Sequence, residues 1–294
     1  MLLLASAHAG STEDDAVEAA RTVLAAAGPA ELVTTQTPEE LDAALLAAAG
    51  RLVVLAGGDG SLHLTVTRLR RLGLLAQVPL GLVPLGTGND LARALGLPLD
   101  PADAARLVLS EPPRPLDLLV DDAGGVVVNA VHVGVGADAA AAASRWKPRL
   151  GPLAYPLSAI AAGVRARGWR LRVVVDGRVV TDGHRRSLMV GVGNGRGIGG
   201  GTELVPTAVA DDGLLDVVVS YATGPIARAR YGTALASGTH LRDRDVRWAR
   251  GRTVTVSGEP VGVNADGELG DEVTARTWTV EPGAWSLVRP AVAG

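Results

Sequence analysis

The stretch Leu52-Val-Val-Leu-Ala-Gly-Gly-Asp-Gly-Ser61 predicts a strand, a tight glycine loop and the start of a helix. Its apolar first half stops at two glycines, and residues 62–72 then carry apolar side chains at roughly helical spacing. Glycines let a phosphate approach the main chain, and a helix N-terminus adds N–H donors and positive charge. The stretch therefore favours phosphate binding, although an ordinary glycine turn with a solvated Asp59 fits it as well.

Asp59 has the same sign of charge as a phosphate, so it cannot attract one directly. We expect Asp59 to act by binding a divalent cation or by exchanging a proton.

The composition excludes several classes of protein. The chain has 294 residues, of which 47% are apolar, enough for one large or two ordinary domains. A net charge of −3 and 3% aromatic residues argue against a nucleic-acid partner. The absence of cysteine excludes disulfides and thiolate metal sites.

The apolar segments are too short or too interrupted for membrane insertion. A transmembrane helix needs about 20 largely apolar residues. The longest candidate, residues 124–143, is broken by Asn129, His132 and Asp138, and residues 1–4 are too short for a signal peptide. We expect no transmembrane segment and a cytoplasmic protein.

The first half of the chain alternates strands and helices. Strands are predicted at residues 2–5, 31–35, 52–55 and 78–83, and helices at 14–27 and 37–49. Thr37, Pro38 and Glu40 give the second helix an N-cap, a proline in its first turn and a capping box. Such alternation implies an open, mostly parallel α/β sheet whose ligands bind at the carboxyl ends of the strands.

The second half is rich in strand-like runs separated by Asp-Gly and Gly turns, which suggests a mostly antiparallel second domain. Strands are predicted at residues 116–120, 125–135, 169–175, 178–181, 187–192, 214–220, 252–257, 272–280 and 285–288, the last crossing back to the first domain. Helices are predicted at 138–165 and 226–238, the latter folding over the sheet.

A second glycine loop follows the fourth strand. Pro84-Leu-Gly-Thr-Gly-Asn-Asp90, together with Gly57-Gly-Asp-Gly-Ser61, resembles the signature of the diacylglycerol kinase catalytic-domain family, which includes the sphingosine and ceramide kinases. The first loop is shared with NAD kinases and phosphofructokinases, whereas the second is more specific to lipid kinases. Further matches follow in order along the chain: Asp117; Asn129 with Gly134 and Gly136; Asn194; residues 199–201; Pro206; residues 211–216; and residues 266–268.

The resemblance implies a lipid kinase that uses ATP and Mg²⁺ to phosphorylate a lipid hydroxyl, with diacylglycerol the leading acceptor. It implies a nucleotide-binding α/β domain over residues 1–113 and a lipid-binding β-sandwich over residues 114–283, with a strand near 284–290 returning to the first domain. The nucleotide contacts implied are Ser6, His8, Ala9, Gly10, Thr35, Gly57, Gly58, Gly60, Ser61, Gly86, Thr87, Gly88 and Asn89. Thr35 is preferred to Thr37, which is assigned to the helix cap. Asp90, Arg93 and Asp117 are expected near the phosphates or the substrate.

Two acids compete for the role of general base. The resemblance favours Glu268 as the base that removes the proton of the acceptor hydroxyl, with Asp59 organising magnesium and phosphate. Sphingosine kinases suggest the reverse, and on spacing alone Asp266-Gly-Glu268 is a hairpin turn.

The acidic run Asp211-Asp-Gly-Leu-Leu-Asp216 resembles the family's structural magnesium site. The implied ligands are the Asp212 side chain and the carbonyls of Val209 and Leu214. A β-turn with solvated acids is the alternative.

Some positions depart from the family pattern. The first turn, Ser6 to Ser11, lacks the usual Asn, Pro and base, and His63-Leu64 stands where Asn-Glu is common. A nucleotide-binding module with little kinase activity, an NAD-kinase-like enzyme and a sphingosine or ceramide kinase therefore stay open as alternatives.

The acceptor lipid lies in a membrane, so we expect transient binding to its inner face. The Arg- and Trp-containing stretches 145–149 and 165–170 are candidates for docking, although a solvated surface fits them equally. The sequence is compatible with a homodimer.

Overall fold

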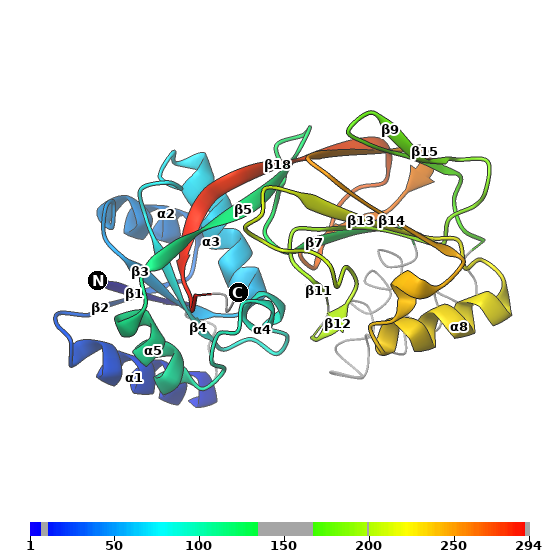
Figure 1. Cartoon of the computed structure of the whole chain (residues 1–294). Coiled ribbons are helices and arrows are strands. Elements are labelled where there is room, and N and C mark those ends of the chain that lie inside the picture. Colours follow the sequence, from blue (N-terminus) through cyan, green and yellow to red (C-terminus); the bar gives the residue numbers. More distant parts are fainter. Residues whose placement is uncertain (7–10, 135–166, 199, 292–294) are drawn as a thin grey trace. The chain divides into compact units, whose positions relative to one another are not determined.

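The computed structural model describes residues 1–6, 11–134, 167–198 and 200–291 (Figure 1). Its chain divides into two compact units, one made of Met1–Asp117 and Pro282–Gly294 and the other of Leu118–Glu281. The helix predicted over residues 138–165 lies outside the described residues.

The first unit contains an open parallel sheet. Its strands are β1 (Leu2–Ser6), β2 (Glu31–Thr35), β3 (Val53–Gly57), β4 (Leu80–Pro84) and the end of β18 (Val273–Val288), in the order β2-β1-β3-β4-β18. The chain proceeds from β1 outward to β2 and then returns to the other side at β3. This reversal creates a topological switch point, the place where open α/β sheets bind ligands.

Helices cover both faces of this sheet (Figure 1). Helices α1 (Ser11–Ala25) and α5 (Pro101–Ser110) pack on one face, where Leu24 and Val108 join a core with Val54. Helices α2 (Pro38–Ala47) and α3 (Asp59–Arg71) contact each other and bury their own apolar side chains, which include Leu45 and Val66. This coverage buries all of β4 and all of β3 except its last residue, Gly57, and strands covered on both faces need apolar residues throughout.

Helix starts follow local sequence signals. The Thr37 hydroxyl accepts a hydrogen bond from the Glu40 main chain at 3.2 Å, which confirms the predicted cap, while Glu40 reaches back to the N–H of Gln36 at 2.7 Å. The sequence reasoning missed α5, although it has the same kind of start. Asp100 caps α5 by accepting from the N–H groups of Ala102 and Asp103, and Pro101 follows as its first residue.

The second unit is a sandwich of mostly antiparallel strands. One layer contains β8 (Leu171–Val175), β9 (Arg178–Asp182), β15 (Thr253–Val261) and the first part of β18, with β5 (Pro113–Asp121) and β6 (Val126–Val127) at its edge. The other has the order β14 (Val246–Gly251), β13 (Leu215–Ser220), β10 (Met189–Gly193), β7 (Ala130–Gly134), β16 (Val263–Ala265) and β17 (Glu268–Leu269). A short hairpin, β11 (Gly197–Ile198) with β12 (Thr202–Glu203), completes the unit.

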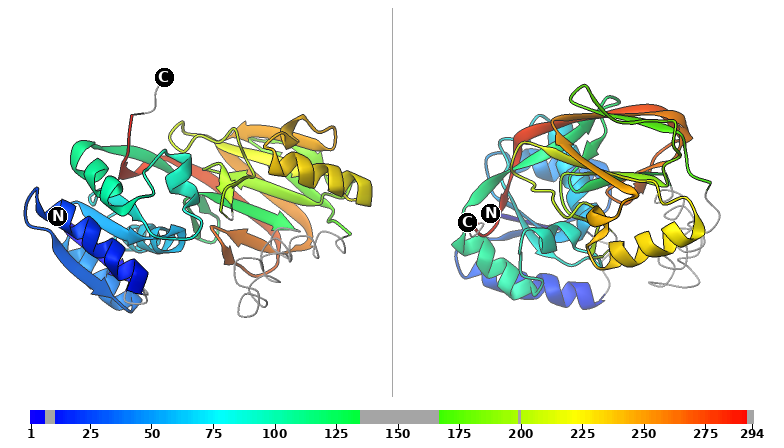
Figure 2. Two further views of the ribbon diagram at one scale, coloured as in Figure 1. Left: turned by 90° about the horizontal axis from the view of Figure 1, so that it is seen from below. Right: turned by 45° about the vertical axis from the view of Figure 1, so that its right-hand side comes forward.

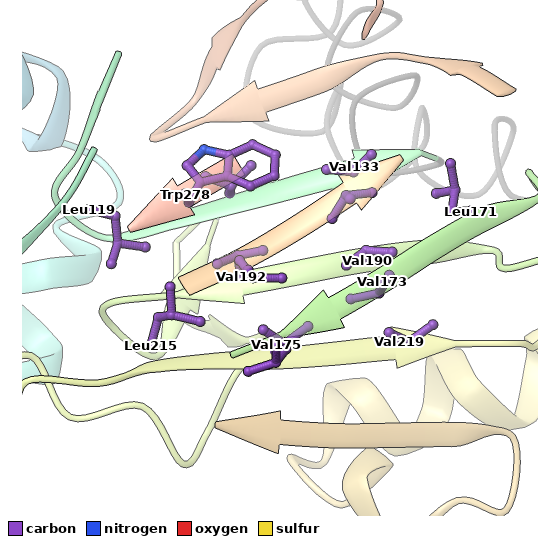
Figure 3. Packing of buried hydrophobic residues seen from close by; sticks show 14 of the residues in the cluster. Leu119, Val133, Leu171, Val173, Val175, Val190, Val192, Leu215, Val219 and Trp278 are labelled. Carbon is purple, nitrogen blue, oxygen red and sulfur yellow. The ribbon is translucent and has the colours of Figure 1, made fainter. Parts of the chain in front are cut away.

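The core of this unit lies between the two layers (Figure 3). Alternate residues of each strand point inward, as shown by Leu171, Val173 and Val175 on β8 and by Val190 and Val192 on β10. Trp278 of β18 fills the same core and is 1% exposed. The two-residue periodicity of these strands is what a two-layer β-sandwich requires.

Helix α8 (Pro225–Ala236) lies along the strands of the second unit (Figure 2). Its Tyr231 packs with Met189, Val218 and Val246, on the side of the sheet that faces away from the sandwich core. The predicted fold-back of this helix over the sheet is therefore confirmed. The predicted fold class is confirmed as well: an α/β unit with a parallel sheet and a mostly antiparallel β-sandwich.

The strand pattern differs from the prediction in several places. Strands β14, β16 and β17 and the hairpin of β11 with β12 were not predicted. Residues 272–280 and 285–288 form one continuous strand, β18, whose Leu287 pairs with Leu80 of β4 in parallel. Within the strand predicted over 125–135, residues 126–134 divide into β6 and β7 because the main-chain N–H groups of residues 128–130 donate to a side chain, described below.

Candidate nucleotide and phosphoryl-transfer site

The carboxyl edge of the parallel sheet collects the predicted nucleotide contacts of the first unit. Ser6 and Thr35 are neighbours at the ends of β1 and β2, and Gly57 pairs with Pro84 at the ends of β3 and β4. The carboxyl ends of these four strands therefore lie at the same edge. His8, Ala9 and Gly10 lie outside the described residues.

The first glycine loop is very short. Strand β3 ends at Gly57 and helix α3 begins at Asp59, with Gly58 as its N-cap in an extended conformation. The amino end of α3, with its partial positive charge, therefore lies directly at the edge of the sheet. A helix of 13 residues placed in this way favours an anionic ligand.

The two glycine loops pack main chain against main chain. A Cβ added at Gly58 would lie 2.8 Å from the Cα of Gly86, and one added at Gly86 would lie 2.6 Å from the Cα of Gly58. The N–H of Leu85 also donates to the carbonyl of Gly57 at 3.1 Å. These glycines are thus required for the contact itself, in addition to any close approach by a ligand.

Asp59 ties the first loop to the second. One of its carboxylate oxygens accepts from the N–H of Asp90 at 3.0 Å, and the other accepts from the N–H of Leu91 at 3.3 Å. These N–H groups belong to the first turn of α4 (Asp90–Ala94). Asp59 therefore supplies the side-chain cap that Asn89, the N-cap residue of α4, does not provide.

Asn89 shapes the second loop. It adopts a left-handed conformation, with φ of 50°, which asparagine tolerates better than most residues. Its side-chain oxygen accepts from the N–H of Gly86 at 3.0 Å, and its side-chain nitrogen donates to the carbonyl of Gly86 at 2.7 Å. Thr87 is exposed and Gly88 half-buried between these two fixed points, so the loop presents a defined main-chain surface to solvent.

The predicted phosphate-vicinity residues lie in two places. Asp90 is buried in the first turn of α4, and the exposed Arg93 donates to the carbonyl of Gly88 at 3.0 Å, so both adjoin the second glycine loop. Asp117 is 2% exposed on β5, where its carboxylate accepts from the N–H of Gly283 at 2.8 Å and its carbonyl accepts from the indole of Trp285. Asp117 thus joins β5 to β18.

Glu268 lies on an exposed hairpin of the second unit. It pairs with Ala265 across the turn Asp266-Gly267, whose φ values of 50° and 89° are those of a type I′ turn. Glu268 and Asp59 belong to different units. The roles expected of them, Glu268 as the general base and Asp59 as the residue that organises magnesium and phosphate, therefore stay predictions.

Asp266, beside Glu268, has a contact that sequence reasoning missed. Its carboxylate accepts hydrogen bonds from the main-chain N–H groups of Val128, Asn129 and Ala130 at 2.6–2.9 Å. Because these N–H groups lie just before β7 and at its first residue, Asp266 fixes the start of that strand and the base of the Glu268 hairpin together. The Asp-Gly pair signals the turn, but no local pattern signals the remote partners.

Asn129 and Asn194, two of the residues that match the family pattern, are buried and form hydrogen bonds with the main chain. The side chain of Asn129 donates to the carbonyl of Gly197 at 2.6 Å, and that of Asn194 donates to the carbonyl of Val128 at 2.8 Å. An added Cβ at Gly195 would lie 2.0 Å from the Asn129 side-chain oxygen, so this position accepts only glycine without rearrangement. These residues hold the loop after β10 to the start of β7.

Among the residues predicted to hold a structural magnesium ion, Asp212 already has partners within the chain. One oxygen of Asp212 accepts from the N–H of Leu214 at 3.0 Å, and the other forms an ion pair with Arg250. Across the described ranges, no group of three or more His, Asp or Glu side chains is disposed to hold a metal ion. The Asp212 oxygen that does not bind Leu214 is paired with a cation of the chain itself.

Two family models match the chain. The diacylglycerol kinase catalytic domain matches residues 1–120, and the YegS C-terminal NAD kinase beta sandwich-like domain matches residues 129–289. A "Probable lipid kinase YegS-like" of Pseudomonas aeruginosa strain UCBPP-PA14 is 34% identical over 99% of this chain and 94% of its own. One of the same name from Stenotrophomonas maltophilia strain K279a is 34% identical over 82% of this chain and 79% of its own.

The fold also matches that of solved structures. A crystal structure described as a diacylglycerol kinase from Bacillus anthracis str. Sterne superimposes with a TM-score of 0.79, covering 98% of this chain and 96% of the other at 23% identity. This likeness concerns the fold alone.

The two matched family models together span most of the chain and define its class, the kinases. The chain belongs to the YegS and diacylglycerol kinase family and is a lipid kinase. None of its helices in the described ranges has the length and hydrophobicity that a membrane crossing requires.

Proposed function

We propose that this chain transfers the γ-phosphoryl group of ATP, taken up as its magnesium complex, to the free hydroxyl of diacylglycerol, giving phosphatidic acid and ADP. The observation that carries the proposal is the pair of glycine loops, packed against each other and tied by Asp59, at the carboxyl edge of the parallel sheet. The family supplies the acceptor class, and the relatives' names support a lipid.

The nucleotide binds at this edge in our proposal. Main-chain N–H groups of Gly57, Gly58, Gly60 and Ser61, and of Thr87 and Gly88, face the phosphates, since glycine loops leave such donors accessible. Gly86, whose own N–H binds Asn89, lines the same surface without a side chain. Asn89 holds the second loop in shape, and the first turn from Ser6 to Gly10 together with Thr35 contacts the rest of the nucleotide. In this proposal Arg93 and Asp90 lie beside the phosphates, and Asp117 lies near the acceptor substrate.

The transfer itself requires few chemical groups. The acceptor oxygen forms a bond to the γ-phosphorus while the bond from that phosphorus to the bridging oxygen of ADP breaks. The hydroxyl proton passes to a carboxylate, and ADP leaves with the electron pair of the broken bond. Most of the catalytic effect comes from alignment of the reactants and from neutralisation of the phosphate charges.

We propose Glu268 as the carboxylate that takes the proton. It is exposed on its hairpin, so an acceptor can reach it. Asp59 is the weaker candidate because both of its oxygens already accept main-chain hydrogen bonds from α4. In this proposal Asp59 aligns the loops and does not act as the base.

The acceptor resides in a bilayer, so the enzyme works in our proposal on the cytoplasmic face of the membrane without crossing it. Magnesium enters with ATP, because this ion keeps several waters and is commonly held by substrate phosphates with one or two carboxylates.

The test is a transfer assay with γ-labelled ATP against a panel of acceptors. Diacylglycerol, sphingosine, ceramide and NAD are presented separately, each with magnesium and each with excess EDTA. Labelled phosphatidic acid, lost in EDTA, is the expected result. Labelled sphingosine or ceramide phosphate would move the assignment to those kinases, and labelled NADP would move it to an NAD kinase.

A further result would end the proposal altogether. If no acceptor is labelled while ATP still binds tightly to the purified protein, the chain is a nucleotide-binding module. Equilibrium binding of ATP, measured on the same preparation, separates that outcome from a protein that has lost its fold.

A further inference from the structure

The acidic turn of the second unit holds its own cation. Asp212 and Asp216 flank the start of β13, and Arg250 of β14 stands directly opposite Asp216 in the antiparallel pairing of the two strands. The guanidinium of Arg250 reaches both acids. Its Nε donates to Asp216 at 3.0 Å, and one terminal nitrogen pairs with Asp212.

Asp216 is fully buried, so its charge needs partners within the protein. It has three: the Thr207 hydroxyl at 2.6 Å, the Trp248 indole N–H at 2.9 Å, and the Arg250 Nε. These three donors replace the water that burial removes from the carboxylate, and Arg250 is the partner that brings the opposite charge.

Asp212 keeps 27% of its side chain accessible. Its carboxylate contacts both the main chain and Arg250. The N–H of Leu214 binds one oxygen at 3.0 Å, which closes the turn. A divalent ion bound to the other oxygen would lie next to the guanidinium and meet a charge of the same sign.

We propose that Arg250 supplies the positive charge of the Asp211–Asp216 turn in this chain, so that the β-sandwich is stabilised without a magnesium ion bound to Asp212. The planar fork of arginine suits two carboxylates at fixed positions, and its charge does not depend on the free metal concentration. Any magnesium requirement of the enzyme then arises from the nucleotide alone.

The test measures thermal unfolding of the full-length protein without nucleotide, in EDTA and in millimolar MgCl2. For the unaltered protein, the two melting temperatures are expected to agree within about 1 °C. Arg250→Met removes the charge and keeps most of the apolar stem. It is expected to lower the melting temperature by about 3 °C or more, and magnesium is expected to restore part of that loss.

Two further variants make the readout specific. Arg252→Met removes an exposed arginine two residues along the chain, and it is expected to behave as the unaltered protein in both buffers. Asp212→Asn, combined with Arg250→Met, is expected to abolish the restoration by magnesium because it removes the charged ligand.

The proposal is overturned if magnesium raises the melting temperature of the unaltered protein and Asp212→Asn removes that rise. It is also overturned if Arg250→Met folds and magnesium does not restore any stability. Should Arg250→Met fail to fold, calorimetric titration of magnesium into the unaltered protein and into Asp212→Asn decides. Binding heat that is present in the unaltered protein and absent in Asp212→Asn contradicts the proposal. The absence of binding heat in both proteins supports it.

Discussion

The carboxylate of Asp59 in helix α3 accepts the main-chain N–H of Asp90, the first residue of helix α4, at 3.0 Å. A second hydrogen bond from Leu91, at 3.3 Å, uses the other oxygen. An acid placed between two glycine loops is therefore the cap of the helix that follows the second loop. This contact links the two segments that we propose as the phosphate-binding loops.

Replacing Asp59 by alanine should damage phosphoryl transfer beyond its effect on folding. Loss of a helix cap costs about 0.5–2 kcal/mol of unfolding free energy. Misalignment of the loops should lower kcat/KM by about a hundredfold or more, because positioning dominates phosphoryl transfer. Denaturant unfolding and steady-state kinetics on the same preparation measure both quantities.

Asp100→Ala is the matched control for that variant, since Asp100 caps α5 through two comparable hydrogen bonds. It should cost a similar unfolding free energy and leave kcat/KM within about threefold, as expected for a change outside a catalytic site. Equal kinetic losses in the two variants would show that Asp59 matters only as an ordinary cap.

Gly60→Ala should separate phosphate binding from folding. An added Cβ meets nothing within 4 Å, and the residue lies in the first turn of α3, so the fold should gain about 0.5–1 kcal/mol from the better helix former. The same methyl group would stand where we place the phosphates, so the KM for ATP should rise about tenfold, a loss of about 1.4 kcal/mol in binding.

Gly232→Ala provides the comparison, because Gly232 is exposed in α8 and its added Cβ also meets nothing within 4 Å. It should give the same gain in stability with an unchanged KM for ATP. An unchanged KM in Gly60→Ala as well would argue against phosphate binding at the first loop.

Glu268→Gln should lower kcat by about 10²–10⁴, the usual contribution of a general base, and leave the affinity for ATP unaltered. The hairpin should keep its shape, since the side chain is exposed and the turn is set by Asp266 and Gly267. Glu272→Gln, a change at an exposed acid just beyond β17, should have no effect on kcat. Near-full turnover in Glu268→Gln would transfer the role of base to Asp59 or to another group.

Acid should destabilise the second unit through His132. Burial lowers the pKa of this side chain to about 4, whereas an unfolded histidine titrates near 6.5. Between these values the unfolded chain binds a proton that the folded one does not, so stability is complete above about pH 6.5 and falls toward pH 4. The contribution of this histidine is on the order of 3 kcal/mol.

The measurement is the difference in unfolding free energy between pH 7 and pH 4.5. It should be smaller in His132→Gln than in the unaltered protein, whatever that variant does to stability at pH 7. His184→Gln changes a side chain that is 90% exposed and should retain the full difference. If His132→Gln keeps the full difference too, the acid sensitivity originates elsewhere, for instance at His240, whose pKa burial also lowers.

Much of the local structure was predictable, because short-range patterns determine it. The β3 strand, the glycine loop at Gly58 and the cap at Thr37 depend on neighbours within a few residues, and each lies where the sequence placed it. Helix α5 was equally predictable from Asp100 and Pro101, and its omission is an error of interpretation rather than a limit of the sequence.

By itself, the sequence determined the class of the protein: an alternating α/β half, a strand-rich half, and two glycine loops of the lipid kinase type. Only the tertiary structure decided what the acids do. Asp59 caps α4 in the second loop, Asp266 binds main chain far along the sequence at residues 128–130, and Asp212 pairs with Arg250. The physical reason is that glycine and apolar patterns act locally, whereas a carboxylate takes whichever donors the fold brings within about 3 Å.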